Sequence, residues 1–159
     1  MKKFFPCMAL VAAGLIACAD RNKLNEQPQN KIKTENSMSN LVSIIEIPAA
    51  DLGRAIKFYS AILGVSIEEA EMGDVKMGVF PAEEGTVNVV LANGSDYTPT
   101  ASGSVLYLNG GDDLQIILDK IAANGGEIIM PKTAISPEMG FYALFTDTEG
   151  NKLGLHSAN

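Results

Sequence analysis

The chain has few of the side chains that usually carry catalysis or bind metals. Its 159 residues include one histidine, His156, and two cysteines, Cys7 and Cys18. A zinc site made of paired cysteines is therefore excluded, and any Ser-His-Asp triad would have to use His156. The sequence also lacks a phosphate-binding loop with its lysine, and it lacks a nucleophile elbow.

Positive charge is scarce as well. From Asn40 onward the chain has 6 Lys and Arg residues against 16 Asp and Glu residues, which gives a net charge near −10. This excess argues against nucleic acid and anionic membrane surfaces as partners, because both repel negative charge. Its simplest consequence is solubility.

The N-terminus is typical of an export signal. Two lysines precede an apolar stretch, residues 4–17, which is too short to span about 30 Å of hydrocarbon as a helix. The run LIAC, which ends at Cys18, resembles the lipobox of bacterial lipoproteins. The resemblance implies that residues 1–17 are a signal peptide and that Cys18 is lipidated. The alternatives are an ordinary cleaved signal and an uncleaved anchor. Cys7 would leave with the signal, so the mature chain would have no internal disulfide.

Residues 18–40 predict a flexible tether. They are rich in Asn, Gln, Lys and Glu, with almost no apolar spacing, so they cannot bury enough surface to offset the entropy of ordering. Ala19 stands where an aspartate would favour retention in the inner membrane of a Gram-negative cell. We therefore expect a protein of the bacterial cell envelope, lipid-anchored at the periplasmic face of the outer membrane. The lipid would be its only membrane contact.

The remaining residues, 41–159, are enough for one compact domain, and their pattern is repeated. IEIPAADLGRAIKFYSAILGV, which starts at Ile45, is echoed by LYLNGGDDLQIILDKIAANGGEI, which starts at Leu106. Each copy, 41–95 and 104–157, has a short strand, an amphipathic helix and three more strands. Two such βαβββ modules, related by a pseudo-twofold axis, predict an α+β fold whose sheets curl into a cleft with the helices outside.

The helices are expected over residues 51–64 and 112–124. Asp51 can cap the first helix, and Asp112 can form a capping box with the glutamine three residues later. Residues 131–140 are expected to form a long loop, which is either a surface connection or a lid over the cleft.

Taken together, these motifs are similar to those of the vicinal oxygen chelate superfamily, which holds glyoxalase I, extradiol dioxygenases and bleomycin-resistance proteins. The matching runs are EIPAADLGRAIKFY, VLYLNGGDDLQIILDKIAANGGEIIMPKT and FYALFTDTEGNKLGLHS, and they cover nearly all of residues 41–157. In the metal-using members, His or Gln and Glu side chains from the two sheets hold one divalent ion. That ion acts as a Lewis acid on the substrate.

Alignment with the family places these four ligand positions at Ile44, Asn88, Val105 and Gly154. Divalent ions of this class prefer imidazole or carboxylate donors, and only Asn88 offers even a weak oxygen ligand. We therefore expect the divalent metal to be absent, and we expect no other cofactor.

Strand alternation predicts which polar side chains line the cleft. Side chains two residues apart face the same side of a sheet, which gives Glu46, Asn88, Tyr107 and His156 in an otherwise apolar cleft. Glu46 and His156 are the candidate catalytic residues. Glu46 is the stronger candidate, because burying a carboxylate on a strand expected to be central costs free energy unless the group is paired or hydrated. The alternatives are that Glu46 bonds a backbone group or Tyr107, and that His156 is an ordinary surface side chain.

The leading interpretation is a lipid-anchored glyoxalase-like domain that binds a small organic molecule in its cleft without a metal, as the resemblance to bleomycin-resistance proteins implies. One alternative is a glyoxalase-type lyase or isomerase, or a dioxygenase-like enzyme, with an atypical or metal-free site built on Glu46 and His156. Another is a structural lipoprotein whose cleft is filled and which acts through a partner. The oligomeric state is open too, with a homodimer formed by exchange of the two copies favoured over a monomer.

Overall fold

The computed structural model describes residues 40–159. The expected signal peptide, Cys18 and nearly all of the expected tether lie outside these residues. Within the described part of the chain, no helix is both long and apolar enough to cross a membrane.

The first module has the predicted βαβββ order. It consists of β1 (Ile44–Pro48), α1 (Leu52–Leu63), β2 (Glu68–Met72), β3 (Val75–Val79) and β4 (Asn88–Asn93). Its sheet has the order β1-β4-β3-β2, with β1 parallel to β4 and the other neighbours antiparallel. The helix caps are those predicted: Asp51 accepts a hydrogen bond of 3.0 Å from the backbone N–H of Arg54, and Gly64 ends α1 with φ at 70°.

The second module repeats this plan. It consists of β5 (Tyr107–Asn109), α2 (Gln115–Ile121), the 3-10 turn η1 (Ala122–Asn124), β6 (Glu127–Ser136), β7 (Gly140–Thr146) and β8 (Lys152–Ser157). Its sheet has the order β5-β8-β7-β6, with β5 parallel to β8. The α+β fold of two βαβββ modules is therefore confirmed.

Two local expectations in the second module are wrong. The expected capping box does not form at Asp112, because α2 begins later and Asp113 accepts the backbone N–H of Gln115 at 2.9 Å. The expected loop at 131–140 is mostly strand, since β6 continues to Ser136 and pairs with β7. β6 is the outer strand of its sheet, where a proline costs no hydrogen bond to a neighbouring strand.

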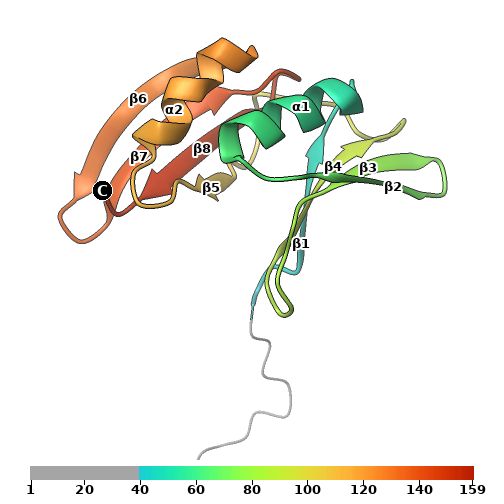
Figure 1. Ribbon diagram of the computed structural model, residues 1–159, viewed down its shortest axis with the longest axis horizontal. Helices are drawn as coiled ribbons and strands as arrows, with labels where there is room; N and C mark the ends of the chain where they lie inside the picture. The colour runs from blue at the N-terminus through green and yellow to red at the C-terminus, as the bar shows by residue number, and fades with distance from the viewer. Residues whose placement is uncertain (1–39) are drawn as a thin grey trace, which may run out of the picture. The chain divides into compact units, whose positions relative to one another are not determined.

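The two modules share one hydrophobic core. α1 and α2 pack side by side, and both lie on the same side of the two sheets (Figure 1). The Phe58 ring of α1 reaches the Phe145 ring of β7, with 6.4 Å between their centroids. The core includes Leu52, Phe58, Tyr59, Ile62 and Leu91 from the first module, and Leu114, Leu118, Ile121, Phe145 and Leu155 from the second. Because burial of apolar surface is the main stabilising term, the modules should unfold together.

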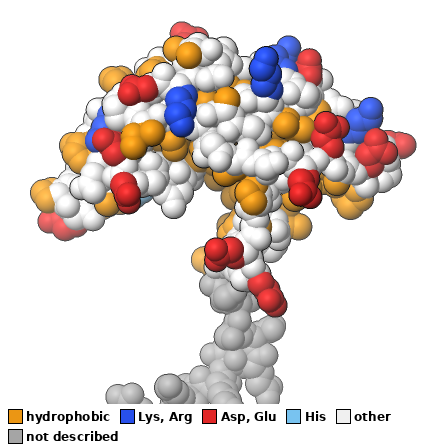
Figure 2. Space-filling view, viewed as in Figure 1, with side chains coloured by type: hydrophobic (Ala, Val, Ile, Leu, Met, Phe, Trp, Pro, Cys, Tyr) orange, Lys and Arg blue, Asp and Glu red, His pale blue; other side chains and the backbone are white. Residues whose placement is uncertain are grey.

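The helix-free faces of both sheets carry exposed apolar side chains. By strand alternation they include Ile44 and Met72 of the first sheet, 59% and 62% exposed, and Tyr107 of the second, 46% exposed. Acidic side chains are spread over the side seen in Figure 2, with few basic ones among them.

Candidate functional site

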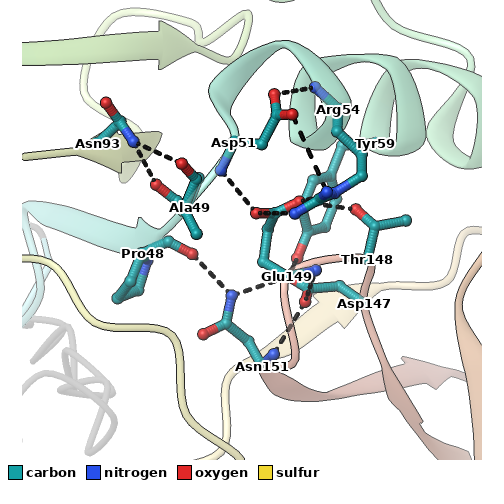
Figure 3. Close-up of polar contacts among 11 residues, drawn as sticks. Pro48, Ala49, Asp51, Arg54, Tyr59, Asn93, Asp147, Thr148, Glu149 and Asn151 are labelled. Atoms are coloured by element: carbon teal, nitrogen blue, oxygen red, sulfur yellow. Dashed lines mark hydrogen bonds and ion pairs between the residues drawn. The ribbon is translucent and has the colours of Figure 1, made fainter.

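The loop after β7, residues 147–151, joins the two modules through buried hydrogen bonds (Figure 3). Asp147, only 4% exposed, accepts hydrogen bonds from the Tyr59 hydroxyl at 2.7 Å and from the Asn151 side-chain amide at 2.9 Å. It also accepts the backbone N–H groups of Glu149 and Asn151. Asn151 in turn donates to the carbonyl of Pro48 at 2.8 Å. Burial, and then the charge of Asp147, raises the pKa of Tyr59 well above its ordinary value. Residues 147–151 therefore have a structural role, because they join the two modules.

Glu149 from the same loop lies at the N-terminus of α1. Its carboxylate accepts the backbone N–H of Asp51 at 2.8 Å and two guanidinium N–H groups of Arg54 at 2.8 and 3.0 Å. Its side chain has no exposed area. Burial alone would raise the pKa of Glu149, but the hydrogen bonds from Arg54, Asp51 and Thr148 outweigh burial and lower this pKa below its ordinary value of 4.5. The contact stabilises α1 and holds the second module against it.

Replacing Glu149 with glutamine should lower the free energy of unfolding by about 1–2 kcal/mol at pH 7, because the charge-assisted hydrogen bonds are lost. The folded-state pKa is depressed, so this stabilisation is present above about pH 4.5 and is lost as the pH falls through the folded value. Urea denaturation from neutral to acid pH should therefore show the difference vanishing in acid. Glu69→Gln, a change on the exposed strand β2, is the matched control. A difference that persisted unchanged in acid would contradict the assignment.

Strand pairing around the family ligand positions differs between the two modules. Glu46 and Tyr107 are equivalent in the repeat, and their partners on the neighbouring strands are Val90 and Gly154. Asn88 lies two residues before Val90 and pairs with Ile44. Asn88 therefore stays the predicted ligand position of the first module, directly opposite Ile44.

The Tyr107 ring occupies the space beside Gly154. A Cβ atom added at Gly154 would lie far inside contact distance of the Tyr107 ring. A glutamate at this position would have to displace the ring. Ile44 and Val105 have no donor atoms in their side chains, and Asn88 offers only an amide oxygen, so the residues at the family positions do not fit a divalent ion.

A pocket of about 550 Å³ lies on the helix-free face of the second sheet. Its lining, here called the tyrosine pocket, consists of Tyr107, Ile135, Met139, Tyr142 and His156. The two tyrosine rings are tilted by 56°, with centroids 6.4 Å apart. His156 Nε2 donates to the carbonyl of Met139 at 2.7 Å, which leaves Nδ1 of the neutral ring as an acceptor. The pocket is thus apolar and aromatic with a few polar atoms, which is typical of sites for small organic ligands.

Of the four predicted cleft residues, only Tyr107 and His156 share a pocket. Glu46 lies on β1, which is an edge strand rather than the expected central one, and its carboxylate accepts the Tyr97 hydroxyl at 3.0 Å. This hydrogen bond is the first cause of a raised pKa at Tyr97. Glu46 borders a second pocket, described below, and Asn88 lines neither of the two. Within the described residues, Glu46 and His156 therefore do not form one acid–base site.

Three members of the tyrosine pocket were not predicted from the sequence. Tyr142 pairs directly with His156, so alternation along β7 could have identified it. Ile135 and Met139 fall in the segment expected to be a loop, where alternation gives no direction.

The fold places the chain in the class of proteins that are built from two βαβββ modules, each of which contributes one curled sheet. The model of the Glyoxalase/Bleomycin resistance protein/Dioxygenase superfamily matches residues 41–155. A "Glyoxylase-like domain-containing protein" from Didymella fabae is 34% identical over 119 residues, which are 69% of this chain and 88% of the relative. The chain belongs to this superfamily.

Solved structures support the fold. A glyoxalase I variant from Zea mays has a TM-score of 0.59 at 20% identity, over 73% of this chain and 46% of that one. This chain thus spans about half the length of the maize protein. A glyoxylase/bleomycin resistance protein/dioxygenase domain from Frankia sp. EAN1pec has a TM-score of 0.58 at 16% identity, over 76% and 98% of the two chains. At these identities the likeness is one of fold alone.

Proposed function

We propose that this chain is a lipid-anchored glyoxalase-like domain that binds a small organic molecule in the tyrosine pocket without the family's divalent ion. The observation that carries the proposal is the position of the Tyr107 ring against Gly154, where metal-using members place a glutamate. Glycine in place of that glutamate removes a metal ligand, and the Tyr107 ring forms an aromatic wall in the same space. The pocket volume of about 550 Å³ lies within the range of small-molecule sites.

The lining of the tyrosine pocket suggests the kind of ligand. Tyr107 and Tyr142 offer ring faces, and Ile135 and Met139 offer adaptable apolar contacts. Nδ1 of His156 can accept one hydrogen bond, and each tyrosine hydroxyl group can donate or accept one. A small aromatic or dicarbonyl compound matches this combination.

A thermal-shift screen of small aromatics and dicarbonyls on the full chain tests the proposal. A ligand at 100 times its Kd should stabilise the folded state by about 2.7 kcal/mol and raise the Tm by several degrees. Tyr107→Ala should abolish the shift. Tyr97→Phe, a change outside the tyrosine pocket, should leave the shift intact. A screen without hits, or hits that survive Tyr107→Ala unchanged, would contradict the proposal.

The remaining features of the proposal concern anchoring and assembly. We place the lipid on Cys18, with the acidic domain held at the cell envelope by residues 19–40 as a tether. We also propose a homodimer formed by exchange of the two modules between chains, in which the apolar helix-free faces are covered. The exposure of Ile44, Met72 and Tyr107 supports this arrangement, because large exposed apolar faces usually mark an interface.

A further inference from the structure

A second pocket, here called the seam pocket, lies where the two modules meet. It has a volume of about 350 Å³ and lies between β1, the segment 100–106 and the start of β8. Its apolar floor comes from both modules and includes Ile45, Ile47, Leu106 and Leu153. None of these residues lines the tyrosine pocket, so the two pockets are separate sites.

The seam pocket has one basic and one acidic side chain, Lys152 and Glu46. Lys152 is half-buried, yet the ion pairs within residues 40–159 involve only Arg54 and Lys132 as cations. One carboxylate oxygen of Glu46 accepts the Tyr97 hydroxyl, and within the same range Glu46 has no cation within 4.0 Å. Both charges therefore border the pocket without neutralising each other.

The neighbouring amide is not free to bind a ligand. Asn151 also lines the pocket, but its side-chain N–H groups are used by the Pro48 carbonyl and Asp147 (Figure 3). Lys152 and Glu46 are thus the charged groups left for recognition. An ammonium group without a carboxylate partner can form a charge-assisted hydrogen bond with an anionic ligand group.

We propose that the seam pocket binds a small zwitterion with an aliphatic side chain, that is, a free amino acid of the leucine type. The carboxylate of the ligand pairs with Lys152, its ammonium group pairs with Glu46, and its side chain lies on the apolar floor. A simple anion would satisfy only Lys152, and a simple cation would satisfy only Glu46. The inference does not depend on the tyrosine pocket or on metal content.

Isothermal titration calorimetry of the full chain tests this with three probes of similar shape. L-leucine has both charges, isocaproate lacks the ammonium group, and isopentylamine lacks the carboxylate. We expect leucine to bind and each truncated probe to bind at least about tenfold more weakly, as expected for loss of a charge-assisted hydrogen bond. No detectable leucine binding, or equal affinities for all three probes, would overturn the proposal.

Single substitutions test the contribution of each charged side chain separately. Lys152→Met should weaken leucine binding about tenfold or more while leaving isopentylamine unchanged. Glu46→Gln should weaken leucine binding similarly while leaving isocaproate unchanged, and its amide oxygen can still accept the Tyr97 hydroxyl. Lys76→Met, at an exposed position on β3, is the matched control and should bind leucine as the parent chain does. Leucine affinity unaltered by both Lys152→Met and Glu46→Gln would overturn the assignment.

Discussion

Replacing Asp147 with alanine is expected to lower the free energy of unfolding by about 3–5 kcal/mol. The carboxylate accepts four hydrogen bonds: one from the Tyr59 hydroxyl, one from the Asn151 side chain, and two from the backbone N–H groups of Glu149 and Asn151. Alanine would leave these donors buried without a partner, and each unsatisfied group costs about 1–3 kcal/mol. The lost hydrogen bonds are those that stabilise the contact between the modules.

Urea denaturation followed by circular dichroism measures this change. Asp147→Asn, which keeps an acceptor oxygen, should lose less than Asp147→Ala. Asp119→Ala, at an exposed position on α2, should change stability by no more than about 0.5 kcal/mol. If Asp147→Ala were as stable as Asp119→Ala, the buried network would not hold the modules together.

Replacing Phe58 with alanine is the second change with a large expected effect, a loss of about 3–5 kcal/mol. Phe58 is 1% exposed, and its ring lies 5.1 Å from the Tyr59 ring and 6.4 Å from the Phe145 ring, centroid to centroid. It also packs against Gly126, where an added Cβ atom would lie 3.0 Å from the Phe58 ring. Truncation would open a cavity in the core shared by the modules.

The Phe58→Ala variant should unfold in one transition at lower urea, because both modules lose packing at once. Phe141→Ala, a change at a half-buried ring of the second module alone, should cost less. Two separated transitions, with one module unfolding at the midpoint of the parent chain, would show that the core is not shared.

Much of the fold could be predicted from the sequence, because its signals are local. Three-four spacing of apolar residues identified both helices, and Asp51 and Gly64 marked the ends of α1 correctly. The second helix start was missed because Asp112 matches the pattern of a cap, whereas α2 begins at Gln115 after Leu114, without a side-chain capping hydrogen bond. β6 was cut short at Pro131, which normally ends a strand. At this outer edge the pairing shifts between Met130 and Thr133, and the strand continues.

The candidate site could be predicted only in part. Alternation along β5 and β8 placed Tyr107 and His156 on one face, and both line the tyrosine pocket. Glu46 was assigned to the same cleft, but its partner is Tyr97, from a segment without strand periodicity. The four family ligand positions come from alignment and stay a prediction, because register depends on which strands pair.

We expect the chain to bind its ligand without the family's divalent ion. The most direct measurement is the metal content, by mass spectrometry, of the full chain purified from medium supplemented with zinc, nickel and manganese. No ion should be retained stoichiometrically, and chelator treatment should leave the ligand-induced rise in Tm unchanged. A stoichiometric ion that is lost in Glu46→Ala or His156→Ala would contradict this expectation.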